Sequence, residues 1–241
     1  MRVAVLGQGM LGGSLQAALV AAGWAASGWD PEPGVRKRMR QRGLESEATP
    51  DRALRGAGIS VLCAPPRGIL ELLGSPALKG FPGVVTDVGS VKREIARAGR
   101  RALGSRFVPG HPMAGAAESG VGAQRPDLFR DRIWVLAGGS ADARTVVRRM
   151  VRRVGAHPVE MTPARHDQLV AWTSHLPQIL AWMVAARAER HGNLPEGPAY
   201  AALSRLAGAR GREGGIERQR VCLLGDGHDH FHHLADLRRR G

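Results

Sequence analysis

A glycine-rich turn near the start of the chain limits the possible folds more than any other feature. The apolar segment Val3–Leu6 leads into Gly7-Gln8-Gly9-Met10-Leu11-Gly12, and Leu15–Ala22 then has the pattern of a helix. At this spacing the first glycine permits a tight turn, the second lets a pyrophosphate approach the backbone, and the third lets the helix pack closely on the strand. The N–H groups at the helix start then face the phosphates. The predicted cofactor contacts in this turn are Gly7, Gly9, Met10, Leu11 and Gly12.

A carboxylate follows where the ribose of a dinucleotide is expected. Ala26–Trp29 predicts the second strand and Asp30 ends it, about 20 residues after the turn, where a carboxylate accepts hydrogen bonds from the ribose hydroxyls. An acidic side chain there favours NAD, because it would repel the 2′-phosphate of NADP. Arg36 and Arg38 lie nearby, so NADP stays open; a turn without any ligand is the remaining alternative. Ala64 and Pro65, after the next strand, complete the predicted cofactor contacts.

Strand and helix patterns alternate over the first part of the chain and change character after it. Further strands are predicted at Ser60–Ala64, Gly83–Asp87, Arg106–Pro109 and Ile133–Ala137, and helices at Val35–Arg42 and Val91–Leu103. This alternation predicts an α/β fold, a doubly wound and mostly parallel sheet with helices on both faces. From Ala164 to His191 the apolar spacing predicts one long helix, which Pro177 should kink or break. We therefore expect a nucleotide-binding domain (1–161), an all-α domain (162–209) and an atypical tail (210–241).

Two motifs bring a serine and a histidine to one edge of the predicted sheet. They are Asp87-Val88-Gly89-Ser90-Val91-Lys92 and Gly110-His111-Pro112-Met113-Ala114-Gly115. Ligands bind at the carboxyl ends of the strands in such sheets, so Ser90 and His111 should face the nicotinamide end of the site. A histidine can take a proton from an alcohol as a hydride leaves. Ser90 would bind the substrate or orient that imidazole, or it is simply the N-cap of the next helix.

These motifs, with Ser174-His175-Leu176-Pro177, resemble the prephenate/arogenate dehydrogenase family over about residues 1–185. The resemblance implies a Rossmann-type domain followed by a helical domain that forms a homodimer. It also implies an NAD-dependent oxidoreductase of tyrosine biosynthesis, which converts prephenate to 4-hydroxyphenylpyruvate by oxidative decarboxylation. Prephenate and arogenate are both left open as the preferred substrate. No fused chorismate mutase or regulatory domain is expected.

The resemblance also assigns roles to individual residues. It implies that His111 is the catalytic histidine, that Ser90 assists it, and that His175 lies in the substrate pocket. Gly197–Arg205 resembles a family pattern whose arginine binds a substrate carboxylate, which nominates Arg205; a guanidinium binds a carboxylate through two parallel hydrogen bonds. The alternatives are a structural helix histidine at 175 and a solvated helix arginine at 205.

The chain departs from the family pattern in two places. A carboxylate often follows the catalytic histidine by six positions in the family, whereas here that position is Ala117 and Glu118 comes next. Beyond Gly208 the amphipathic periodicity fades and Gly, Arg and His become frequent, so we expect a divergent or frame-shifted end of the reading frame. The cluster His228–His233 could bind a metal, but with no scaffold around it we expect an incidental polar tail and no metal site.

Two other readings of the same chain stay open. A 3-hydroxyacid dehydrogenase would need a catalytic lysine on the long helix, and Ala164–His191 contains none. An inactive nucleotide-binding paralogue would bind NAD without turning over a substrate. Kinetics with prephenate, arogenate and hydroxyacids would separate these readings.

Composition narrows the remaining classes of function. Lys and Arg number 35 and Asp and Glu 21, so the net charge is 35 − 21 = +14, but the arginines are spread along the chain and a nucleic-acid partner is not expected. No apolar run reaches the roughly 18 residues of a membrane helix, and no cleaved secretory signal is expected. Cys63 and Cys222 cannot make a disulfide framework, so a cytoplasmic protein is expected.

Overall fold

The computed structural model describes residues 1–115, 121–189 and 197–207 and divides the chain into two compact units. The first unit is Met1–Leu169 and the second begins at Val170. The functional boundary at residue 161 stays a prediction, whereas the division between the compact units lies eight residues later (169 − 161).

Six parallel strands form the main sheet of the first unit, in the order β3-β2-β1-β4-β5-β6. Their bounds are β1 Arg2–Leu6, β2 Ala25–Trp29, β3 Glu45–Ser46, β4 Ile59–Leu62, β5 Val84–Asp87 and β6 Phe107–Val108. This is the strand order of the doubly wound dinucleotide-binding fold. The predicted fold class, a mostly parallel sheet of Rossmann type, is confirmed.

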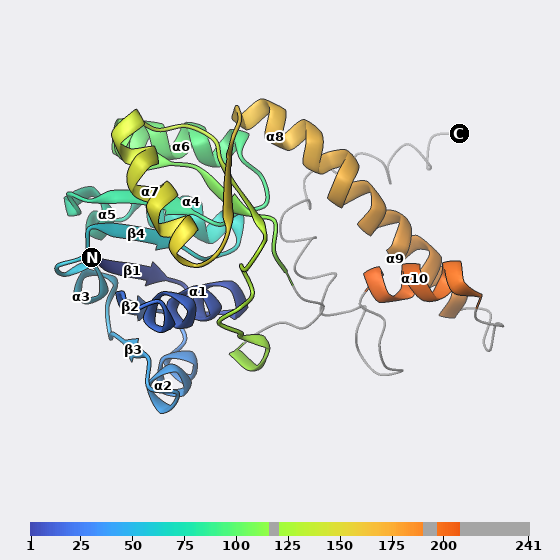
Figure 1. The fold of residues 1–241 in the computed structure, drawn as a ribbon, viewed down its shortest axis with the longest axis horizontal. Coiled ribbons are helices and arrows are strands. Elements are labelled where there is room, and N and C mark those ends of the chain that lie inside the picture. Colours follow the sequence, from blue (N-terminus) through green and yellow to red (C-terminus); the bar gives the residue numbers. More distant parts are fainter. Residues whose placement is uncertain (116–120, 190–196, 208–241) are drawn as a thin grey trace, which may run out of the picture. The chain divides into compact units, whose positions relative to one another are not determined.

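Helices cover both faces of this sheet (Figure 1). The helices up to residue 153 are α1 Met10–Ala21, α2 Pro33–Gln41, α3 Pro50–Leu54, α4 Pro66–Gly74, α5 Pro76–Gly80, α6 Arg93–Leu103 and α7 Ala141–Arg153. A further helix, α8 Pro163–Val170, ends the first unit, and its last residue opens the second. Side chains of a strand alternate between its two faces. Accordingly Val3 and Val5 of β1 belong to the core cluster that includes residues of α1 and α7, whereas Ala4 and Leu6 belong to the cluster that includes residues of α4 and α6.

A second, three-stranded sheet follows the main one. Its strands are β7 Gly110–Pro112, β8 Ile133–Leu136 and β9 His157–Glu160. β7 runs antiparallel to β8, and β8 runs parallel to β9. The predicted strand at Ile133–Ala137 therefore belongs to this small sheet. β9 was not predicted, because its residues are largely exposed and lack an apolar pattern.

The second unit is helical in the residues that are described. A π-helical turn at Ala171–His175 follows α8, and α9 (Leu176–Glu189) and α10 (Pro198–Ala207) come next. The small residues Ala181, Ala185 and Ala207 are buried where α9 and α10 pack together. Pro177 has no N–H to donate to the carbonyl four residues before it, which gives a physical reason for the wider turn that precedes it. The interruption that Pro177 was expected to cause is therefore a π turn.

The helical stretch Pro163–Ala188 is unusually apolar for its length. Among the described residues it is the one helix that is long and apolar enough to cross a membrane by length and composition, with 26 residues and a mean hydropathy of 1.2 in an 18-residue window. This differs from the expectation that no apolar run reaches about 18 residues. The polar residues Thr173, Ser174 and His175 interrupt the run of apolar residues, yet the mean hydropathy of the window stays high. One such helix is weak evidence for a membrane span, because a core helix of a soluble protein has the same character.

Candidate active site

The glycine turn, residues 7–12, has the close contacts that require glycine. Gly7 has a φ of +100°, in the left-handed region, and its N–H donates to the carbonyl of Trp29 at 2.7 Å. A Cβ at Gly12 would lie 1.8 Å from the carbonyl oxygen of Gly7, so α1 approaches the strand more closely than a side chain allows. A Cβ at Gly9 would meet nothing within 4 Å. The turn is therefore tight on its inner side and open at Gly9, which is what a bound pyrophosphate requires.

Asp30 joins the end of β2 to this turn. Its Oδ2 accepts a hydrogen bond from the backbone N–H of Gln8 at 2.7 Å and its Oδ1 accepts from that of Glu32 at 3.0 Å. The side chain of Arg36 donates to the backbone carbonyls of Asp30 and Pro31. Asp30 is thus held beside the glycine turn, as its spacing in the sequence predicts.

A network of neutral polar groups, which sequence reasoning missed, supports the glycine turn. The Nε2 of Gln8 donates to the Oε1 of Gln16 at 2.7 Å, and the hydroxyl of Ser46 donates to the Oε1 of Gln8. The Nε2 of Gln124 donates to the carbonyls of Gln8 at 2.8 Å and Gly9 at 3.0 Å. These four side chains, Gln8, Gln16, Ser46 and Gln124, are buried and are called the amide network below. The available signal was the presence of glutamine at positions 8 and 16, within a turn and helix otherwise built from apolar and small residues.

The ends of three strands lie level at this edge of the sheet. Leu6 pairs with Leu62, and Leu62 pairs with Asp87. Ala64 and Pro65 follow β4 after one intervening residue, Cys63, and Pro65 is the N-cap of α4. The glycine turn, the segment after β4 and the segment after β5 therefore meet at one edge, as expected for a ligand crevice.

A buried ion pair fixes the start of β7. Lys92 donates from Nζ to Asp87 and to the carbonyl of Gly110, the latter at 2.8 Å, while Oδ1 of Asp87 accepts from the N–H of Gly110 at 3.0 Å. Both charged side chains are 0% exposed. Burial lowers the pKa of Lys92, against the opposing effect of the Asp87 carboxylate. The backbone immediately before His111 is thereby held on both its N–H and its carbonyl.

His111 lies in a chain of three side chains from β7 to α8. Its Nδ1 is 2.8 Å from Nε2 of His166, and Nδ1 of His166 is 2.7 Å from Oδ1 of Asp167. The carboxylate of Asp167 also accepts from the backbone N–H groups of Lys92 at 2.7 Å and Arg93 at 3.0 Å. His166 is fully buried, and the two imidazole rings meet edge to face at 73°. Sequence reasoning missed both His166 and Asp167.

Ser90 lies in the segment between β5 and α6. The N-cap of α6 is Lys92, and the carboxylate of Asp167 accepts from the first N–H groups of that helix. The alternative reading of Ser90 as a helix cap is therefore not what the structure shows. Its role beside His111 stays a prediction.

The remaining predicted residues lie in the second unit or outside the described residues. His175 is half-buried at the end of the π turn, and Arg205 is exposed on α10. Their roles in substrate binding stay predictions. The position of Glu118, the tail after residue 207 and the cluster His228–His233 lie outside the described residues. Cys63 has a free thiol whose pKa is raised by burial.

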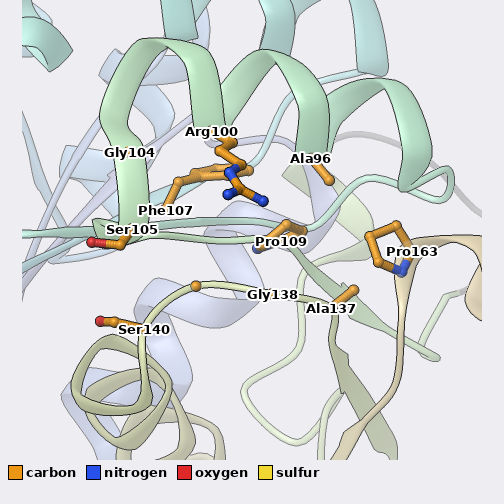
Figure 2. A pocket seen from close by; sticks show the side chains of 11 residues that line it. Ala96, Arg100, Gly104, Ser105, Phe107, Pro109, Ala137, Gly138, Ser140 and Pro163 are labelled. Carbon is orange, nitrogen blue, oxygen red and sulfur yellow. The ribbon is translucent and has the colours of Figure 1, made fainter.

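A cavity of about 530 Å³ lies elsewhere in the first unit. It is bounded by α6 on one side and by the loop that leads into α7 on the other, with Arg100, Phe107 and Pro109 among its lining residues (Figure 2). It includes none of the predicted site residues. The candidate site therefore lies outside this cavity, at the sheet edge where the hydrogen bonds of Asp30 and His111 are found.

Comparisons with known proteins agree with this geometry. The family described as prephenate dehydrogenase, nucleotide-binding domain, matches residues 17–160. Cyclohexadienyl dehydrogenase of Zymomonas mobilis is 32% identical over 192 residues, which are 76% of this chain and 65% of that protein. Prephenate dehydrogenase of Bacillus subtilis is 32% identical over 145 residues, 57% of this chain and 39% of that protein. The chain thus spans less than two thirds of the length of these relatives.

Solved structures show the same likeness. Prephenate dehydrogenase of Aquifex aeolicus in complex with hydroxyphenyl propionate and NAD⁺ has a TM-score of 0.76 at 25% identity, with 100% of this chain and 91% of that chain covered. Arogenate dehydrogenase of Synechocystis has a TM-score of 0.69 at 27% identity, with 98% and 90% covered. The family match spans more than half of the chain, and the glycine turn and the histidine at the sheet edge agree with it. This chain belongs to the prephenate dehydrogenase family.

Proposed function

We propose that this chain catalyses the NAD-dependent oxidative decarboxylation of prephenate to 4-hydroxyphenylpyruvate. The observation that carries the proposal is the placement of His111: it follows the ion pair that fixes the start of β7, next to the strand ends that carry the glycine turn. A histidine at this edge suits the removal of a hydroxyl proton.

The residues of the first unit fit a nicotinamide dinucleotide. The open side of Gly9 and the start of α1 would hold the pyrophosphate, because Gly9, the N-cap, has no side chain that would occupy the N–H groups there. Asp30 would accept hydrogen bonds from the ribose hydroxyls, which favours NAD. When bound, NAD supplies the acceptor for the hydride that leaves the ring carbon bearing the hydroxyl.

His111 would take the proton of the ring hydroxyl as that hydride leaves. The resulting ketone is conjugated to the ring carbon that carries the carboxylate, so the C–C bond to the carboxylate breaks and CO2 departs. The electron pair of that bond makes the ring aromatic and places a negative charge on the ring oxygen. His111 then returns its proton to this oxygen, and the products are 4-hydroxyphenylpyruvate, CO2 and NADH. The residues mainly position the reactants and move one proton, because aromatisation drives the step.

Three further residues carry substrate-binding roles in the proposal. Ser90 would hydrogen-bond the substrate or orient the imidazole of His111. Arg205 would bind a carboxylate through its planar guanidinium, and His175 would line the substrate pocket. Arogenate is the second candidate substrate, and the likeness to the arogenate dehydrogenase of Synechocystis favours its inclusion in every assay.

The test is NADH formation with prephenate and with arogenate, each with NAD and with NADP. We expect turnover with NAD, and His111→Asn should lower kcat by about 10²–10⁴-fold while the Kd of NAD stays unchanged. Unchanged turnover in that variant would overturn the role of His111. NAD binding without turnover of either substrate would overturn the proposed activity and favour an inactive nucleotide-binding paralogue.

A homodimer formed through residues after Thr162 is part of the proposal. Large apolar side chains of the second unit are exposed, including Trp172 at 69%, Met183 at 64% and Leu180 at 48%. Exposed apolar residues at this density suit burial in an interface between two copies of the chain. Sedimentation should show a dimer, and a stable monomer at all concentrations would contradict it.

A cytoplasmic location also stays a proposal, supported by the free thiol of Cys63.

A further inference from the structure

We propose that His166 and Asp167 are positioning residues for His111: they fix which ring nitrogen of His111 carries the proton, so that Nε2 is the base. The inference rests on the proposed function, in which His111 takes the hydroxyl proton. It assigns a role to the first helical residues of the 163–188 stretch, which lie outside every motif that the sequence singled out.

The order of the hydrogen bonds fixes the tautomers of both imidazoles. An ionised carboxylate can only accept, so the 2.7 Å contact with Asp167 requires the proton of His166 to be on Nδ1. A neutral imidazole has one proton, so Nε2 of His166 is an acceptor. The 2.8 Å contact with His111 therefore requires a proton on Nδ1 of His111. The lone pair of neutral His111 is then on Nε2, which makes this nitrogen the one that can take the proton of an alcohol.

The charge of Asp167 is held in place by another helix. Burial raises the pKa of Asp167, but hydrogen bonds from His166 and from the N–H groups of Arg93 and Lys92 outweigh it, and the pKa is lowered. Those N–H groups begin α6, a helix of 11 residues whose dipole favours an anion at this end. Asp167 therefore stays a carboxylate, as the tautomer argument requires.

Burial keeps His166 neutral, against most of the charges around it. Desolvation lowers the pKa of His166 against the effects of Asp167 and Asp87, which raise it; Lys92 lowers it further. In the part of the chain that the structure describes, the titratable groups that face His166 are Asp167 on α8, His111 on β7, Lys92 before α6 and Asp87 on β5. Asp87 and Lys92 oppose each other as a buried pair, which leaves the charge of Asp167 to stabilise the imidazolium that forms when His111 gains a proton.

The first test measures the tautomers and requires no turnover. Nitrogen-15 NMR of histidine-labelled wild-type protein, assigned with His111→Asn and His166→Gln variants, should show both His111 and His166 protonated on Nδ1 at neutral pH. In Asp167→Asn the tautomer of His166 should change, because an amide can donate at this position. A wild-type His111 protonated on Nε2 would overturn the proposal.

The second test separates positioning from packing by paired variants at one site. In His166→Gln the amide oxygen can still accept from Nδ1 of His111, whereas His166→Leu removes the acceptor that His166 provides. We expect kcat to fall about tenfold in the glutamine variant and by about 10²–10⁴-fold in His166→Leu and Asp167→Asn, with KM and the Kd of NAD unchanged. Equal losses in the glutamine and leucine variants, or losses expressed in KM alone, would overturn the proposal.

The pH profile provides a readout that packing alone would not move. In Asp167→Asn the acid limb of kcat/KM should shift to lower pH, because the cation of His111 loses a nearby negative charge. Asp142→Asn is the matched control: Asp142 lies in the first turn of α7, far from the imidazoles in sequence, and its profile should equal that of the wild type. An unshifted limb in Asp167→Asn would contradict the proposal.

If wild-type protein turns over neither substrate, the proposed function fails, while the NMR result still decides the tautomers.

Discussion

Two polar networks support the sheet edge where the candidate site lies, and they are built from different chemistry. The amide network behind the glycine turn consists of four neutral side chains, Gln8, Gln16, Ser46 and Gln124, and the guanidinium of Arg42, which does not titrate in the physiological range, donates to Gln124 at 2.9 Å. The network around His111 consists of ionisable side chains, Asp87, Lys92, His166 and Asp167. A neutral network holds a backbone turn in the same way at every pH. An ionisable network also sets the protonation of a base, and it makes stability depend on pH.

Breaking the ionisable network should have the largest effect. Lys92→Met leaves the buried carboxylate of Asp87 without its counter-ion, and loss of one partner of a buried pair costs about 3–5 kcal/mol. Urea unfolding at neutral pH measures this loss. Arg67→Met, which removes a pair with Glu71 whose side chains are 89% and 68% exposed, should change stability by less than about 0.5 kcal/mol. A similar small effect at Lys92 would show that the pair does not hold the site.

The amide network should be weaker and insensitive to pH. Gln16→Met keeps the length of the side chain but leaves the Nε2 of Gln8 without its acceptor, which costs about 1–3 kcal/mol. We expect the same loss of unfolding free energy at pH 5 and pH 8, together with weaker NAD binding. A loss that differs between the two pH values would remove the distinction between the networks.

The smallest effect is the titration of His166. Its folded pKa is lowered from the ordinary 6.5, so the unfolded state takes up a proton more readily as the pH falls. The stability that neutral His166 contributes is complete above about pH 6.5 and is lost as the pH falls from there towards the folded value. Unfolding free energies between pH 8 and pH 5 should decline in the wild type by more than in His166→Gln. Parallel curves for the two proteins would contradict this linkage.

The parts of the structure that depend on local sequence were predictable, and the rest depends on tertiary contacts. Val3–Leu6, the glycine turn and Asp30 are set by spacing within one strand–helix–strand segment, and the structure places them as expected. Asp87 and Lys92 belong to the motif in which the sequence singles out Ser90 as the candidate site residue. Nothing local marks them as a buried pair, because that depends on how the chain returns to Gly110.

The contacts among His111, His166 and Asp167 were even harder to predict from local sequence. His111 and His166 are 55 positions apart. His166 and Asp167 begin a helix where polar residues usually face solvent, so the pattern gave no reason to single them out. β9 was missed for a related reason: its strand character comes from pairing with β8, and its own residues are largely exposed.

The link from Asp167 to the start of α6 also has a consequence for how the first unit folds. The carboxylate accepts from the N–H of Lys92 across 75 positions of sequence. The N–H groups at the start of α6 therefore gain this acceptor only when α8 has docked, and closing a contact of such long sequence separation costs chain entropy. The amide protons of Lys92 and Arg93 should exchange with solvent at the rate at which α8 undocks. Those two amides thus report, in the absence of any ligand, how often the base loses its support.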